Sequence, residues 1–95
     1  MRNVLRRGKR IANANMQFVF LLNQDKTPRF AFVVSTQVDK RATKRNRIKR
    51  LMREAARHLL PQIRGSIDAI LIARSKDEVG ITRSVDELFH KAELL

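Results

Sequence analysis

One segment, residues 41–57 with the sequence RATKRNRIKRLMREAAR, constrains the fold more than any other. Its apolar residues, and one just beyond it, recur at intervals of three and four: Ile48, Leu51, Met52, Ala55 and Leu59. This spacing places them in a single stripe along an α-helix, as expected for a helix that docks on a core. Pro61 predicts the end of the helix, because proline has no amide hydrogen to donate and disrupts a helix interior.

The same segment carries eight cationic side chains and a single acid, Glu54. The cations are Arg41, Lys44, Arg45, Arg47, Lys49, Arg50, Arg53 and Arg57. Like charges four residues apart destabilise a helix by roughly 0.2–0.5 kcal/mol per pair, and cations in the first turn are unfavourable to the helix dipole. A merely solvated face would alternate both signs, so the pattern favours a phosphate-binding surface over a solvated charged face.

Arginine dominates this surface, and its planar guanidinium can bind two phosphate oxygens at once or stack on a base. Asn46 offers both a donor and an acceptor, which suit a base, a ribose hydroxyl or the backbone of RNA. The alternative for Asn46 is a local role, in which it satisfies the backbone at the start of the helix.

The composition predicts one small basic domain, residues 1–95, with a net charge of +12 that suits a polyanionic partner. There is no cysteine, which excludes disulfides and thiolate metal sites. The apolar runs FVFLL, FAFVV and AILIA have five residues each, too short to span a bilayer, and the first ten residues lack the apolar stretch of a signal peptide. We therefore expect a soluble, cytoplasmic protein with no membrane association.

The remaining chain alternates strand and helix patterns. Residues 16–22 and 29–36 are rich in aromatic and β-branched residues and flank a turn-forming cluster, which predicts a β-hairpin. Residues 67–73 predict a buried strand, and residues 8–13 a brief first strand after the remnant of a helix. Together with the basic helix and a closing helix, this order predicts an α+β fold.

The closing helix is predicted to open with a capping box formed by Ser84 and Glu87. Its apolar residues share one helical face: Val85, Leu88, Phe89 and Ala92. Alternation along residues 29–36 gives the second strand two unlike faces. The bulky face carries Phe30, Phe32 and Val34, and the low face carries Ala31, Val33 and Ser35. All five phenylalanines are expected in the core: Phe18, Phe20, Phe30, Phe32 and Phe89.

Side chains suited to catalysis are few and scattered. His58 and His90 stand without an HExxH motif or paired carboxylates around them, which argues against a metal or acid–base site. Asp77 and Glu78 are adjacent in a predicted loop, so their carboxylates are expected to point apart. We therefore expect neither a catalytic site nor a metal site in the protein itself.

The run KRNRIKRLMRE, residues 44–54, resembles the Arg-Asn-Arg signature of the bacterial ribonuclease P protein subunit. The flanks agree: RFAFVVS and Ala42 are similar to the family's third strand and loop, and IDAILIAR to its last strand. The resemblance covers residues 8–95. It implies the order α-β-β-β-α-β-α in one domain, with a left-handed crossover around the basic helix in place of the usual right-handed one.

The resemblance also implies a function. The family's protein binds a catalytic RNA, and together they remove the 5′ leader from precursor tRNA by metal-dependent hydrolysis. The RNA performs this chemistry and holds the divalent metal, Mg²⁺, so no cofactor and no obligate protein partner are expected for the protein alone. The expected RNA-binding residues are Lys40, Arg41, Lys44, Arg45, Asn46, Arg47, Lys49, Arg50, Arg53 and Arg57.

The resemblance further implies a cleft between the basic helix and the sheet that holds the single-stranded leader. Its expected lining is Val19, Leu21, Ala31, Val33 and Ser35. Small side chains let a nucleotide chain approach closely, which fits the low strand face. For Val19 and Leu21, ordinary core packing is the alternative.

The sequence departs from the family pattern at two places. Thr36 and Gln37 stand where many members have two basic residues. The contribution of those residues to leader or RNA binding is either missing here or supplied by Lys40 and Arg41. The first helix is short, and Leu5 stands at one of two positions that are usually aromatic, the other falling before the first residue.

Two other functions are consistent with the charge pattern. One is a non-catalytic, structural RNA-binding protein of the ribosomal type, which would bind RNA without changing any cleavage rate. The other, ranked third, is a DNA-binding protein with a recognition helix in the major groove. That function requires a helix free to project into the groove, whereas this helix carries a continuous core stripe.

Overall fold

The structure is a computed structural model that describes residues 2–23, 27–63 and 65–95. The chain forms α1 (Arg2–Arg7), β1 (Lys9–Ala12), β2 (Met16–Asn23), β3 (Arg29–Val33), α2 (Ala42–Leu59), β4 (Ser66–Ala73) and α3 (Ile81–Lys91). A 3-10 turn, Leu60–Gln62, follows α2 and contains Pro61. The predicted α+β class and element order are confirmed. None of the helices within the described ranges is both long and apolar enough to cross a membrane.

The four strands form one mixed sheet in the order β1-β2-β4-β3. β2 runs antiparallel to β1 and β4, whereas β3 runs parallel to β4. The predicted hairpin between the second and third strands is therefore wrong, although these strands do run in opposite directions. The turn-rich connector predicts a reversal of the chain but not the pairing partner. The left-handed crossover through α2 stays a prediction.

The composition of β4 explains why this strand lies between β2 and β3. From Ala69 to Ala73 its side chains are apolar on both faces, with Leu71 buried on one face and Ile70 on the other, and Ile67 is buried on the same face as Leu71. A strand that is apolar on both faces is most stable inside a sheet, where both of its edges are also hydrogen-bonded. In the register, Leu71 stands beside Phe18 of β2 and Phe32 of β3.

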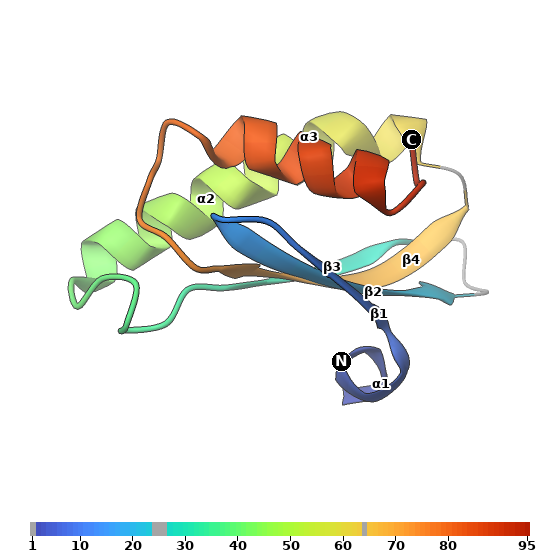
Figure 1. The fold of residues 1–95 in the computed structure, drawn as a ribbon, viewed down its shortest axis with the longest axis horizontal. Coiled ribbons are helices and arrows are strands. Elements are labelled where there is room, and N and C mark those ends of the chain that lie inside the picture. Colours follow the sequence, from blue (N-terminus) through green and yellow to red (C-terminus); the bar gives the residue numbers. More distant parts are fainter. Residues whose placement is uncertain (1, 24–26, 64) are drawn as a thin grey trace.

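Helices α2 and α3 lie side by side on one face of the sheet, and α1 lies on the other face (Figure 1). The predicted apolar stripe of α2 faces this core. Ile48, Met52 and Ala55 are buried, and Leu51 and Leu59 are partly buried against the same cluster. The stripe is thus confirmed, and its burial turns the opposite face of α2 to solvent.

All five phenylalanines stack in a continuous column within or beside this core. The ring centroids are 4.9 Å apart for Phe18 and Phe89, 5.1 Å for Phe18 and Phe20, and 6.1 Å for both remaining contacts. Phe30 forms both of the longer contacts, with Phe32 and with Phe89. The expectation that these residues belong to the core is confirmed, because β2, β3 and α3 meet through them.

Helix α3 begins at Ile81, three residues before the predicted capping serine, so the predicted capping box is wrong. The backbone N–H of Ser84 donates to the carbonyl of Gly80 at 2.9 Å, an interaction of the helix interior. The buried Ser84 hydroxyl accepts a hydrogen bond from the Asn15 side chain at 3.0 Å. The serine therefore ties α3 to the β1–β2 connection, a long-range role that a local motif does not reveal.

Helix α1 crosses the other face of the sheet, where Val4 is buried with Val19 and Ile70. The chain passes from α1 into β1 through Gly8, whose N–H donates to the Val4 carbonyl at 2.7 Å. A Cβ atom on Gly8 would lie 2.9 Å from the carbonyl oxygen of Phe20 and in contact with that of Val4. Only glycine allows this close approach without a shift of the backbone.

Candidate nucleic-acid interface

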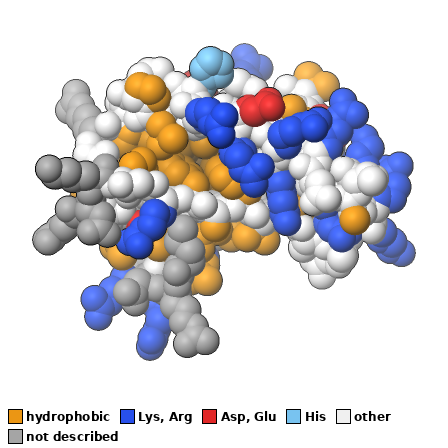
Figure 2. Space-filling model, turned by 180° about the vertical axis from the view of Figure 1, so that it is seen from behind, with side chains coloured by type: hydrophobic (Ala, Val, Ile, Leu, Met, Phe, Trp, Pro, Cys, Tyr) orange, Lys and Arg blue, Asp and Glu red, His pale blue; other side chains and the backbone are white. Residues whose placement is uncertain are grey.

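The face of α2 that points away from the core is densely cationic. Figure 2 shows Lys and Arg side chains gathered over this helix, with hydrophobic side chains exposed below them. Five arginines of the predicted set are exposed: Arg41, Arg47, Arg50, Arg53 and Arg57. Lys44, Arg45 and Lys49 are partly buried. Asn46 is exposed in the second turn, past the helix start at Arg41, so it does not cap the helix.

The start of α2 has no acid in its first turn, and Asp39 supplies the missing negative charge. Its carboxylate accepts hydrogen bonds from the Arg41 backbone N–H at 2.9 Å and from the Arg41 guanidinium at 3.2 and 3.1 Å. The guanidinium, followed by the backbone N–H, lowers the pKa of Asp39 from 3.8 to about 2. Arg41 is thus held at the N-terminus, where its charge is partly neutralised.

Arg45, the first residue of the predicted signature, also supports the helix start. Its Nη1 donates to the backbone carbonyls of Asp39 and Lys40, at 3.1 and 2.8 Å. These bonds leave the remaining donors of the guanidinium available, because arginine has five. Arg45 therefore contributes charge to the cationic face and also holds the loop that precedes α2 in place through two hydrogen bonds.

A second acid, Glu78, approaches the same end of α2 from the loop between β4 and α3. Its Oε1 lies 3.3 Å from Nε of Arg47 and 3.6 Å from Nζ of Lys44. Arg47, the second arginine of the signature, is therefore paired with an acid. Asp77, the neighbouring acid, instead accepts the backbone N–H of Val79 at 3.1 Å, so the two carboxylates serve different partners.

Further along α2, Arg53 connects the cationic face to the edge strand β3. Its guanidinium carbon lies 5.6 Å from the centroid of the Phe32 ring, a cation–π contact at the end of the phenylalanine column. Among the described residues, no carboxylate forms an ion pair with Lys49, Arg50 or Arg57. The middle and C-terminal parts of the face are thus the least neutralised.

The predicted leader residues lie on the sheet face opposite α2, and the predicted position of the cleft, between α2 and the sheet, is therefore wrong. The stripe of α2 and the phenylalanines fill that space. On the opposite face, Val19 is fully buried and Leu21 and Ala31 are partly buried around it. Val33 is 42% exposed and Ser35 is exposed, so these two are accessible. Val19 is therefore a core residue, as the alternative to a place in the leader cleft predicted.

A hollow of about 560 Å³ adjoins Ser35 at the ends of β3 and β4. Its lining is Gln17, Ser35, Gln37, Val38, Ile72, Ala73 and Arg74. Sequence reasoning missed Gln17, Ile72 and Arg74 as neighbours of Ser35. Alternation along β4 indicates that Ile70 and Ile72 share a face, but only the strand order shows which residues of β2 and β3 stand beside them.

Comparison with known proteins identifies the family. The family model described as Ribonuclease P matches residues 1–93. The chain belongs to the ribonuclease P protein family. A "Ribonuclease P protein component" of Synechocystis is 33% identical over 98 residues, covering 97% of this chain and 78% of that protein. The RNase P protein of Staphylococcus aureus has a similar structure, with a TM-score of 0.88 at 26% identity, covering 98% of this chain and 88% of that one.

A higher identity over a shorter stretch is found with a "Ribonuclease P protein component" of Xanthomonas oryzae pv. oryzae. It is 53% identical over 51 residues, which cover 54% of this chain and 34% of that protein. The matched part thus spans about a third of the length of this relative, whereas the family model covers nearly the whole chain.

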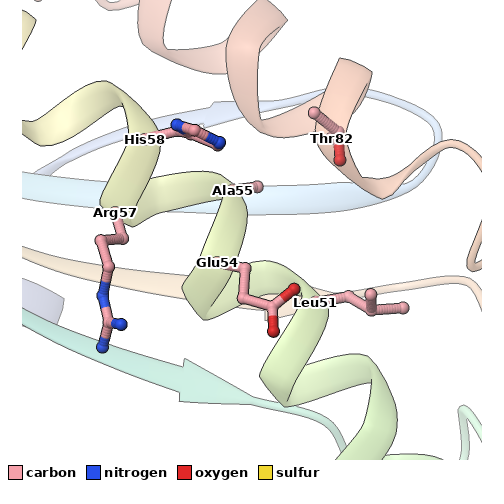
Figure 3. Close-up of a pocket in the computed structure, with 6 residues that line it drawn as sticks. All are labelled: Leu51, Glu54, Ala55, Arg57, His58 and Thr82. Atoms are coloured by element: carbon pink, nitrogen blue, oxygen red, sulfur yellow. The ribbon is translucent and has the colours of Figure 1, made fainter.

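A groove of about 360 Å³ separates α2 from α3 on the outer surface of this family member (Figure 3). Its lining is Leu51, Glu54, Ala55, Arg57, His58 and Thr82. In Figure 3 the side chains of Arg57 and His58 leave α2 in different directions, and Glu54 does not approach either of them. Within the described ranges, no three His, Cys, Asp or Glu side chains converge to hold a metal ion.

The lowered pKa of Asp39 predicts an acid-dependent contribution to stability. A group whose pKa is depressed on folding stabilises the protein above its unfolded pKa, and this stabilisation is lost as the pH falls through the folded value. The melting temperature of Asp39→Asn should thus lie below that of the wild type at pH 5 and above. The difference should shrink from about pH 4 to about pH 2, the interval between the two pKa values.

Thermal unfolding followed by circular dichroism at several pH values measures this difference. Asp86→Asn, which removes an acid on α3 outside the loop, serves as the control. A difference between Asp39→Asn and wild type that stays constant from pH 5 to pH 2 would show that the ion pair with Arg41 does not stabilise the fold.

Proposed function

We propose that this chain is the protein subunit of ribonuclease P and binds the catalytic RNA through the cationic face of α2. The observation that carries the proposal is the geometry of α2 in a member of this family. Its apolar stripe is buried in the core, so the Arg45-Asn46-Arg47 signature and the following basic residues stand on a rigid, outward face. A fixed array of guanidinium groups suits the regularly spaced phosphates of a folded RNA.

In this proposal the RNA performs the cleavage chemistry and the protein assists it, as the side chains near the cationic face indicate. Endonucleolytic removal of the 5′ leader requires an activated water, and the divalent metal that activates it is assigned to the RNA partner. The two acids that approach the cationic face from outside α2, Asp39 and Glu78, already face arginine and lysine groups, and Glu54 of α2 itself is exposed. The protein contributes by neutralising phosphates and by holding the RNA in place.

The second part of the proposal concerns precursor tRNA, whose single-stranded leader would lie on the open sheet face. Val33 and Ser35 are accessible there, and the neighbouring hollow carries the cation Arg74 at its rim. A low surface bordered by positive charge accommodates a nucleotide chain with little dependence on base identity. The open sheet face would thus bind the single-stranded leader, whereas the cationic face of α2 would bind the folded catalytic RNA.

Arg50 provides the test of the α2 interface, because its side chain is exposed and no described carboxylate pairs with it. Its positive charge would therefore be neutralised by an RNA phosphate. Replacing Arg50 with Ala should reduce the slope of log affinity against log salt concentration by about 0.7–0.9, the effect of one lost phosphate contact. Folding should be unaffected, since an exposed side chain is removed. The slope is measured by filter binding of ribonuclease P RNA at several salt concentrations.

The matched control is Arg83→Ala, which removes an exposed arginine of α3 with the same change in net charge. An equal change of slope in both variants would mean that net charge, and not the α2 face, determines binding.

Val33 provides the test of the leader face. Val33→Glu places a negative charge on the accessible part of this face and should lower the preference for precursor over mature tRNA, because only the precursor has a leader to repel. Binding of the catalytic RNA should change little. The measurement is the ratio of the two affinities in the reconstituted complex, across a series of leader lengths at fixed salt and magnesium.

Leu22→Glu is the control, because Leu22 is 65% exposed and its side chain alternates to the opposite sheet face. If both substitutions lower the ratio to the same extent, or if the ratio does not depend on leader length, the leader lies elsewhere.

A further inference from the structure

Glu78 occupies an unusual place for an acid, over the first two turns of the most cationic helix of the protein. Its Oε1 is buried and lies 3.3 Å from Nε of Arg47 and 3.6 Å from Nζ of Lys44. Its side chain is only 21% exposed. These distances exceed the 2.7–2.9 Å of a strong charge-assisted hydrogen bond, so the ion pairs are loose although the carboxylate is largely removed from water.

The backbone around Glu78 holds this position by a series of turn hydrogen bonds. The Asp77 N–H donates to the Ser75 hydroxyl at 3.0 Å, and the Val79 N–H donates to the Asp77 carboxylate at 3.1 Å. The Ile81 N–H then donates to the Glu78 carbonyl at 3.4 Å, where α3 begins. The loop therefore presents Glu78 to α2 from a fixed backbone, which distinguishes this pair from two long side chains that meet on a surface.

The carboxylate stands where an RNA phosphate would need to lie to contact both cations. Phosphate carries more acceptor oxygens than carboxylate, and guanidinium groups bind it through two parallel hydrogen bonds. A phosphate and the Glu78 carboxylate cannot both face Lys44 and Arg47 without like-charge repulsion. A phosphate that approaches both Nε of Arg47 and Nζ of Lys44 must therefore take the place of the Glu78 carboxylate.

We propose that Glu78 is an internal competitor for the RNA, one that screens Lys44 and Arg47 in the free protein and is displaced by a well-positioned phosphate. This proposal rests on the proposed function, because it assumes that the cationic face binds RNA. Its effect is a threshold: an RNA whose contacts with Lys44 and Arg47 outweigh the ion pairs displaces Glu78, whereas a polyanion with weaker contacts leaves both cations covered. The acid thereby lowers the affinity for both ligands and restricts contact with these two cations to RNA that fits the whole face.

Glu78→Gln tests the proposal, because it keeps the shape of the side chain and removes its charge. The full-length variant should bind both ribonuclease P RNA and a non-specific RNA, poly(U), more tightly than wild type. The expected gain is roughly two- to tenfold at low salt, the size of one or two partly exposed ion pairs. The gain should be at least as large for ribonuclease P RNA as for poly(U), because only the specific RNA breaks the ion pairs in the wild type. The salt slope should steepen by up to about 0.7–0.9 for poly(U), which gains access to new cations, and change little for ribonuclease P RNA.

Two further variants make the result specific to this position. Glu87→Gln removes an exposed acid of α3 and causes the same change in net charge. Glu78→Asp keeps the charge of the loop but withdraws the carboxylate by one methylene, so it should shift affinity in the same direction as Glu78→Gln. The aspartate variant also provides the readout if the glutamine variant fails to fold in a thermal unfolding control.

The outcomes separate the two proposals. Weaker binding by Glu78→Gln than by wild type would show that Glu78 positions Arg47 for RNA. Equal effects of Glu78→Gln and Glu87→Gln would show that only the net charge of the protein matters. Either result overturns the inference. Wild-type protein that binds ribonuclease P RNA no better than poly(U) would instead contradict the proposed function, whatever the Glu78 variants do.

Discussion

The burial of the apolar stripe of α2 against the sheet is the interaction on which the rest of the structure depends. Met52 and Ile48 are fully buried there, and removing side chains of this size from water contributes roughly 1.5–3 kcal/mol each. Repulsion between neighbouring cations on a helix amounts to roughly 0.2–0.5 kcal/mol per pair. Packing therefore outweighs repulsion, and a segment that is too positive to be a stable helix alone becomes a fixed element of the fold.

The same burial decides which side chains face solvent, and two acids adjust the charge of the exposed face. Asp39 neutralises the helix start through Arg41, and Glu78 reaches the next turn from a distant loop. Arg45 donates to the loop carbonyls and so fixes the entry into α2. The N-terminal half of the face is consequently ordered before RNA binds, whereas Arg50 and Arg57 provide the positive charge that no described acid offsets.

Local patterns in the sequence predict local structure in this protein. The stripe from Ile48 to Leu59, the helix end near Pro61 and the apolar face of α3 follow from spacing alone, and all are present. Every phenylalanine is assigned correctly to the core for the same reason. The Arg-Asn-Arg signature identifies the family because several residue types recur at fixed spacing beside a matching strand.

Features that depend on distant partners are not predicted from such patterns. Residues 24–28 indicate a reversal after β2, but the insertion of β4 between β2 and β3 depends on a strand that follows some forty residues later. Ser84 resembles a helix cap in the sequence, yet its hydroxyl pairs with Asn15 in the fold. Alternation separates Val33 from Phe32, but only the position of α2 shows which of the two faces is open.

If the cationic surface of α2 serves a catalytic RNA and not merely a structural one, this protein must change the rate of cleavage. That rate can be measured for a bacterial ribonuclease P RNA that removes the 5′ leader of precursor tRNA at low magnesium, with and without the protein. We expect the protein to raise the rate and to lower the magnesium concentration that cleavage requires, because its arginines replace part of the counterion charge. Binding of the RNA without any change in cleavage rate, at every magnesium concentration, would instead indicate a structural RNA-binding protein.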